Sequence, residues 1–158
     1  MSKNTEQGVK PATLTLVVRR LIRATPEQCF DAWSRPEELL RWWGPRSVTC
    51  TSAEVDLRVG GRYRIANQFP DGATLWISGE FAAIERPRKL MYTWRLEPGA
   101  ELPEQVTVTF TRHAAGTEVI VAHERISDAV KRDRHEQGWI ECLDGLEQHL
   151  ARCARAGG

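Results

Sequence analysis

The sequence predicts an α+β domain in which a curved antiparallel sheet of about six to seven strands wraps around one long C-terminal helix. The segment 128–153 carries apolar or small residues at steps of three and four, as one face of a helix requires: Gly138, Trp139, Cys142, Leu143, Leu146, Leu150 and Cys153. Such a helix is roughly 39 Å long, so it needs a whole sheet as its partner. Between residues 52 and 125, strand patterns are separated by short turns, which join antiparallel neighbours.

The chain before these strands contributes one strand and two short helices. Residues 14–22 are rich in Leu and Val, which is typical of a strand. Residues 25–27 (Thr-Pro-Glu) have the order of a helix start: an N-cap, a proline at the first position and an acid in the first turn. Pro36 ends this helix and begins a second one, which stops before the Gly-Pro pair at 44–45.

The remaining strands follow one another closely. A strand pattern at 57–69 is interrupted by two glycines at 60–61, which indicate a bulge or tight bend. Pro-Asp-Gly at 70–72 predicts a turn, and strand patterns follow at 74–84, 90–96 and 117–125. In 106–110, Val and Phe alternate with Thr, so that strand should have one buried and one solvated face.

Length and composition indicate one soluble domain. The 158 residues suit a single core, with 41% hydrophobic and 27% charged residues. We expect a disordered N-terminal arm at 1–12, a domain at 13–153 and a flexible tail at 154–158. The net charge of +1 provides no attraction for nucleic acid. The sequence contains no apolar run long enough for membrane insertion and no signal core, so we expect a cytoplasmic protein.

Motifs of catalysis and of metal binding are absent from the sequence. It lacks G-x-S-x-G, G-x-x-x-x-G-K-[ST], G-x-G-x-x-G and H-E-x-x-H, so we predict no catalytic residue, no metal and no cofactor. The His-Glu pairs at 123–124 and 135–136 belong to different elements and make a weak metal candidate. Four cysteines, at 29, 50, 142 and 153, show no C-x-x-C spacing and should be reduced thiols that fill core space.

Spaced motifs across residues 13–152 carry a family resemblance. They are Phe-Asp-Ala-Trp (30–33), Arg-Trp-Trp-Gly-Pro (41–45), Asp-Leu-Arg-Val-Gly-Gly-Arg-Tyr (56–63), Gly-Glu-Phe (79–81), Leu-Met-Tyr-Thr-Trp (90–94), Val-Thr-Val-Thr-Phe (106–110), His-Glu (123–124) and His-Glu-Gln-Gly-Trp (135–139). In this order they resemble the SRPBCC (START-like) superfamily, and more narrowly its bacterial branch named after the activator of the heat-shock-protein-90 ATPase. The resemblance implies a helix-grip fold with a deep cavity between the sheet and the long helix. The superfamily includes lipid-transfer domains, hormone receptors, polyketide cyclases and co-chaperone domains, so the fold does not choose among these roles.

The candidate ligand-binding residues come from several elements: Trp43, Trp76, Tyr92, Trp94, His123, His135, Trp139 and Cys142. Buried indole N–H and phenol O–H groups need partners, which suits a planar, partly polar ligand. The alternative is that the aromatic residues only fill the core and that the histidines are hydrogen-bonded structural residues. We expect Gly138, on the apolar stripe, to make room for a strand or a ligand.

Three functions remain open. The favoured hypothesis is a module that binds a hydrophobic or aromatic small molecule, such as a lipid, between the sheet and the long helix. The second is a protein-interaction module of the co-chaperone type, with a chaperone as partner and a role in the stress response. The third, less favoured, is a cyclase- or hydrolase-type enzyme that uses His123 or His135 in acid–base chemistry. A closed interior would favour the interaction module, an open cavity the binder, and a histidine–carboxylate contact in a cavity the enzyme. We expect a monomer or a homodimer.

Overall fold

The computed structural model describes residues 12–97, 99 and 102–157. Apart from position 12, the predicted arm at 1–12 lies outside these residues, as does position 158 of the predicted tail. The described residues form seven strands and three helices: β1 (Leu14–Ile22), α2 (Pro26–Ser34), α3 (Pro36–Trp42), β2 (Thr49–Val55), β3 (Arg62–Gln68), β4 (Thr74–Glu85), β5 (Lys89–Glu97), β6 (Glu104–His113), β7 (Gly116–Ile126) and α4 (Ala129–Gly157). The predicted fold class is therefore confirmed.

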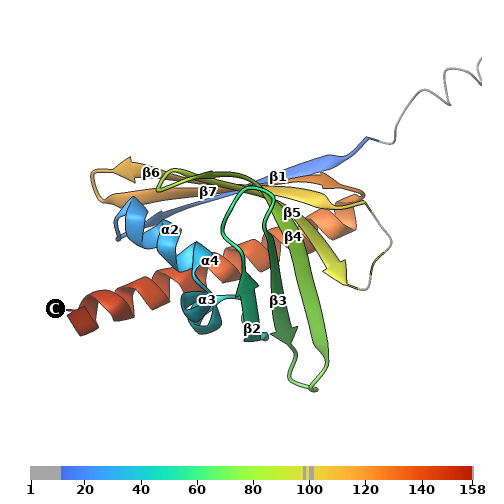
Figure 1. Ribbon diagram of the computed structural model, residues 1–158, viewed down its shortest axis with the longest axis horizontal. Coiled ribbons are helices and arrows are strands. Elements are labelled where there is room, and N and C mark those ends of the chain that lie inside the picture. The colour runs from blue at the N-terminus through green and yellow to red at the C-terminus, as the bar shows by residue number, and fades with distance from the viewer. Residues whose placement is uncertain (1–11, 98, 100–101, 158) are drawn as a thin grey trace, which may run out of the picture.

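The seven strands form one antiparallel sheet with the order β1-β7-β6-β5-β4-β3-β2. Figure 1 shows that β2, β3 and β4 run steeply across the direction of β1, β6 and β7, so the sheet curves around α4. A register shift between Phe81 and Ala83 of β4 lies in this curved region, where an irregular ladder increases the local bend. The concave face receives all three helices.

Local signals position the two short helices as predicted. The Thr25 hydroxyl accepts a hydrogen bond from the Gln28 amide at 3.1 Å, and the Gln28 side chain accepts one from the Thr25 amide at 2.8 Å. This capping box satisfies two amides that have no partner inside the helix. Pro36 starts α3, and α3 ends where the Trp43 amide bonds to the carbonyl of Leu39.

The core lies between the concave face and the stripe of α4. In β6, Glu104, Val106, Val108 and Phe110 alternate toward the interior. The buried positions of α4 are Trp139, Cys142, Leu143, Leu146, His149 and Leu150, which confirms the predicted stripe over most of its length. The helix continues to Gly157, past the boundary that we predicted at Cys153.

Gly138 does not have the role that its place in the stripe predicts. A Cβ atom added there would meet only Cγ of Pro45, at 3.9 Å, which is an ordinary contact. At Gly145, two turns later, an added Cβ would lie 2.8 Å from the carbonyl oxygen of Trp42. Gly145 is therefore the glycine at which α4 approaches another element closely.

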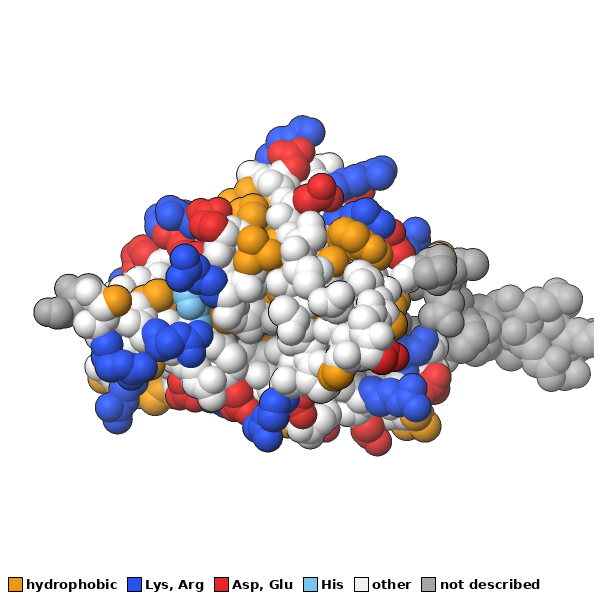
Figure 2. Space-filling view, turned by 90° about the horizontal axis from the view of Figure 1, so that it is seen from below, with side chains coloured by type: hydrophobic (Ala, Val, Ile, Leu, Met, Phe, Trp, Pro, Cys, Tyr) orange, Lys and Arg blue, Asp and Glu red, His pale blue; other side chains and the backbone are white. Residues whose placement is uncertain are grey.

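In the view of Figure 2, basic and acidic side chains are mixed around small apolar patches over most of the face, and several basic side chains gather beside a histidine at the left end. This distribution agrees with the near-neutral net charge. Among the described residues, no helix combines the length and the apolar character that a membrane crossing requires.

Gly138 and Gly145 of α4 are the subject of the first prediction. Gly138→Ala should stabilise the protein by about 0.5 to 1 kcal/mol, because alanine favours the helix and meets no obstacle. Gly145→Ala should destabilise it, because the new methyl group forces α4 away from the Trp42 carbonyl. Urea unfolding of the two variants provides the comparison, and equal stabilities would contradict the helix orientation described here.

Candidate ligand-binding site

An aromatic pocket lies between the concave side of β2–β5 and the two short helices. Its lining residues are Trp33, Leu39, Trp43, Val55, Tyr63, Ile65, Phe81, Tyr92 and Trp94. Its volume is about 20 Å³, little more than one water molecule needs. None of the lining residues comes from α4. The cavity is therefore smaller than the family resemblance implies, and it lies under α2 and α3 instead of beside the long helix.

Tryptophan side chains fill the space between α4 and this pocket. Trp139 of α4 stacks on Trp33 of α2, with ring centroids 5.9 Å apart and planes inclined by 20°. Trp139 also meets Trp43 edge-on at 5.6 Å. The predicted residue Trp139 thus supports the pocket from behind and does not line it.

Strand alternation and helix geometry place the pocket's aromatic residues. Tyr92 and Trp94 lie two positions apart on β5 and share its inner face. Trp42 and Trp43 pack edge to face at the end of α3, with ring centroids 5.4 Å apart. The Trp42 indole N–H bonds to the carbonyl of Ala32 at 2.8 Å, whereas Trp43 faces the pocket.

Two of the residues that line the pocket carry an indole N–H group without an acceptor. The Trp33 indole donates to the Tyr92 hydroxyl at 3.1 Å, and the Tyr63 hydroxyl donates to the carbonyl of Thr93 at 2.6 Å. Among the described residues, the indole N–H groups of Trp43 and Trp94 are buried without a hydrogen-bond partner. An unpaired buried N–H costs about 1 to 3 kcal/mol, so a ligand that supplies an acceptor would recover stability.

A buried polar network lies behind Trp94. One carboxylate oxygen of Glu104 lies 2.7 Å from Nε2 of His123 and 3.0 Å from Nε2 of His135. The Trp139 indole donates to Nδ1 of His123 at 2.9 Å. Because an indole N–H can only donate, Nδ1 is the unprotonated nitrogen, and the His123 proton lies on Nε2 toward Glu104.

The protonation states follow from this network. Burial opposes ionisation of Glu104, but the hydrogen bonds from His123 and His135 outweigh it and lower its pKa to about 2. Burial lowers the pKa of His123, and the bond to Glu104 only partly opposes that effect. Near neutral pH, an ionised carboxylate therefore accepts a hydrogen bond from a neutral His123.

The same geometry is unsuited to a metal ion. Glu104, His123 and His135 offer ligand atoms within 4.8 Å of one another. However, the two imidazole rings stack with centroids 4.5 Å apart and planes inclined by only 12°. A metal ion lies near the plane of each imidazole that binds it, and two stacked planes share no such point. In addition, Nε2 of His123 carries the proton that a metal would have to displace.

The other predicted residues lie at varying distances from the pocket. The structure brings together Trp43, Tyr92 and Trp94, and it places His123 and His135 one layer behind them, each ring in edge contact with Trp94. Cys142 is buried on α4 and is not part of the lining. Trp76 lies on the outer face of β4, where the Arg64 guanidinium covers its ring at 3.7 Å.

Sequence reasoning missed several of these site residues. Trp33 and Phe81 occur in the quoted motifs, but only the tertiary structure joins them at one pocket. Glu104 could have been found, because it continues the inward alternation of Val106, Val108 and Phe110 in β6. A carboxylate on a buried face needs partners, which here are the two histidines.

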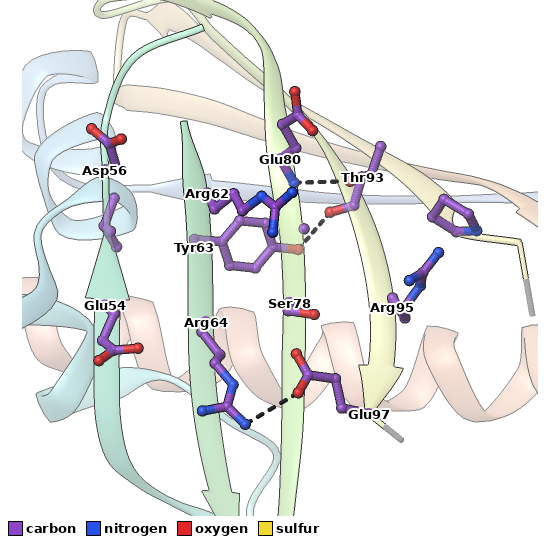
Figure 3. A pocket seen from close by; sticks show the side chains of 13 residues that line it. Glu54, Asp56, Arg62, Tyr63, Arg64, Ser78, Glu80, Thr93, Arg95 and Glu97 are labelled. Carbon is purple, nitrogen blue, oxygen red and sulfur yellow. Dashed lines mark hydrogen bonds and ion pairs between the residues drawn. The ribbon is translucent and has the colours of Figure 1, made fainter. Parts of the chain in front are cut away.

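A second, larger hollow of about 650 Å³ lies on the face of β2–β5 that is turned away from α4 (Figure 3). Arg64 and Glu97 form an ion pair there at 3.1 Å. The other charged side chains in this groove are Arg62 and Arg95 against Glu54, Asp56 and Glu80. Both signs of charge are present in similar number, so the groove selects neither an anion nor a cation.

The fold and the aromatic interior define a helix-grip domain of the SRPBCC class. The chain matches the sequence model of the family described as "Activator of Hsp90 ATPase homolog 1-like protein" over residues 23–151. It therefore belongs to this family, as the resemblance implied.

Solved structures of bacterial proteins share this fold. A protein from Chromobacterium violaceum is 25% identical, with a TM-score of 0.78 over 85% of this chain and 95% of that chain. The AHSA1 protein from Silicibacter pomeroyi is also 25% identical, with a TM-score of 0.75 over 87% and 98%. An AHSA1-like protein from Aeromonas hydrophila, 24% identical with a TM-score of 0.73 over 89% and 94%, shares the fold. No curated protein matches the chain.

The polar network generates a prediction for the dependence of stability on pH. In the unfolded chain His123 has the ordinary histidine pKa of 6.5, whereas burial lowers this pKa in the folded protein. The unfolded state therefore binds a proton first as the pH falls below 6.5, and the free energy of unfolding decreases. A further loss occurs between about pH 4.5 and 2, where Glu104 is protonated first in the unfolded chain.

The matched variant is Glu104→Gln. It should be less stable than the wild type at neutral pH, because both histidines lose a charged acceptor. Between pH 4.5 and 2, the stability of the variant should also change less than that of the wild type. Urea unfolding across the acidic range measures the free energy of unfolding of both proteins. If the variant lost stability as steeply with falling pH as the wild type does, Glu104 would not be ionised in the folded protein.

The cysteines generate a third prediction. Burial raises the pKa of Cys142 to about 12, whereas Cys153 is exposed near the end of α4. A thiol reagent should therefore modify Cys153 quickly in the native protein and Cys142 only after unfolding. Mass spectrometry of timed samples checks this, with Cys153→Ser as the control that removes the fast reaction. Equal native rates would mean that Cys142 is accessible.

Proposed function

We propose that this protein is a small-molecule binding module that holds a hydrophobic or aromatic ligand in the pocket between β2–β5 and the short helices. The supporting observation is the pair of buried indole N–H groups, on Trp43 and Trp94, that have no acceptor among the described residues. Both residues line the same apolar pocket. A pocket wall with unpaired donors favours occupation by a compound that satisfies them.

The small volume implies that binding requires a side chain to move. Tyr63 and Val55 line both the pocket and the outer groove, so the wall between the two hollows is one side chain thick there. Val55 is half-buried at the end of the edge strand β2, where fewer neighbours restrain it. Displacement of this wall would enlarge the pocket without unfolding the core.

A second candidate, a protein-interaction module of the co-chaperone type, is favoured by one specific observation. The interior volume of about 20 Å³ is close to that of a filled core. A domain with a filled core would act through its surface, and the family description refers to an activator of the Hsp90 ATPase. The enzyme hypothesis has less support, because neither His123 nor His135 lines the pocket.

Binding of an uncharged fluorescent dye tests the main proposal. 4-(Dimethylamino)benzonitrile, an uncharged one-ring dye, should bind the folded protein, change its own emission and quench tryptophan emission, because Trp33, Trp43 and Trp94 all line the pocket. Val55→Phe should weaken this binding on the order of tenfold by filling the pocket. Val17→Phe is the matched control, since Val17 is exposed on β1, away from the pocket.

The opposite results would overturn the proposal. If this one-ring dye binds equally well to the wild type and to Val55→Phe, the dye occupies another site. If no dye binds while a purified Hsp90-type chaperone binds the protein, the interaction module replaces the binding module.

A further inference from the structure

The polar groups of the pocket restrict the chemistry of its ligand. An indole N–H donates a hydrogen bond and cannot accept one. The unpaired groups on Trp43 and Trp94 can therefore be satisfied only by acceptor atoms. The nearby Trp33 indole and the Tyr63 hydroxyl already donate to partners within the protein. The pocket thus has a surplus of donors.

The hydroxyl groups of the pocket add to this surplus. Burial raises the pKa of Tyr92 and of Tyr63 far above the ordinary value of a phenol, so both remain protonated. The Tyr92 oxygen accepts the Trp33 N–H, which leaves its own proton to be donated. A ligand that carries mainly donors would find few partners here.

The lining also restricts the charge of the ligand. None of the nine lining residues is Asp, Glu, Lys, Arg or His. The ion-paired side chains Arg64 and Glu97 lie in the outer groove, on the other face of the sheet (Figure 3). A charged ligand would lose its hydration in the pocket without gaining a counter-ion. An uncharged compound is therefore favoured.

Aromatic rings make up most of the pocket wall. Six of the nine lining residues are aromatic, and Tyr63, Phe81 and Tyr92 contact one another at centroid distances of 5.1 to 6.0 Å. Rings in such edge-on arrangements favour a further planar ring over a flexible chain. The pocket of about 20 Å³ must enlarge by displacement of its Val55 and Tyr63 wall even for one ring, so a compact compound is favoured over a larger one.

We propose that the ligand is a compact, uncharged aromatic compound with a carbonyl-type oxygen, such as an aryl ketone or aldehyde, that accepts a hydrogen bond from the Trp43 or Trp94 indole. This inference rests on the proposed function and specifies its ligand class. The indole N–H groups of Trp43 and Trp94 act as the donors. An uncharged compound is favoured because the lining contains no charged side chain.

Matched probes of similar shape test the inference. Acetophenone carries the carbonyl acceptor, ethylbenzene lacks it, and benzoate carries a charge. Titrations of the full-length protein followed by tryptophan fluorescence should show acetophenone binding on the order of tenfold more tightly than ethylbenzene, the effect of one net hydrogen bond. Benzoate should bind more weakly than either compound.

Conservative variants locate the donors. Trp94→Phe together with Trp43→Phe should reduce the preference for acetophenone to within about twofold, because the ring remains and the N–H is lost. Trp76→Phe is the matched control and should keep the full preference, since Trp76 lies on the outer face of β4. Thermal unfolding first establishes that each variant is folded.

A measurement on the wild type does not depend on any variant. In nitrogen-15 NMR spectra, the indole N–H signals of Trp43 and Trp94 should move with acetophenone and much less with ethylbenzene. Equal affinities for the two compounds, with these signals unmoved, would overturn the ligand class but leave the binding module standing. Absence of binding by every probe would overturn the proposed function as well.

Discussion

The buried contacts of Trp139 determine how the layers of this protein fit together. Its ring packs against Trp33 and Trp43, which fixes the distance between α4 and the short helices. Its N–H needs an acceptor once water is excluded, and Nδ1 of His123 provides it at 2.9 Å. That bond selects the His123 tautomer whose other nitrogen donates to Glu104. One indole therefore connects the helix, the sheet and an ionised buried carboxylate.

The position of the pocket follows from this packing. Because tryptophan rings occupy the space beside α4, the remaining hollow lies under α2 and α3 and is walled by strands β2–β5. The network of Glu104, His123 and His135 lies behind Trp94, and none of its three residues lines the pocket. The pocket itself thus combines an apolar wall with unpaired donors on Trp43 and Trp94, and the proposed binding function rests on this combination.

The curvature of the sheet shapes both hollows. At Gly79 of β4, a Cβ atom would lie 1.8 Å from the carbonyl oxygen of Thr93, so only glycine permits the two strands to approach there. The Tyr63 ring packs over this glycine, and the Tyr63 hydroxyl donates a hydrogen bond to the same carbonyl. The bend therefore brings one tyrosine into the wall of the inner pocket and of the outer groove.

Local patterns in the sequence determined the order and type of the elements. The cap at Thr25, the alternation in β6 and the stripe of α4 depend on neighbours within a few residues, so they could be predicted without the fold. The alternation of β4 also contained the signal that Trp76 faces outward, opposite to Ile77 and Phe81, although we grouped Trp76 with the pocket. Only the tertiary structure decided that Gly145 instead of Gly138 lies against another element. It also decided which indoles lack an acceptor and that Glu104 joins two histidines. These features depend on contacts between residues distant in sequence, whose distances are set by the bend of the sheet and the packing of bulky rings.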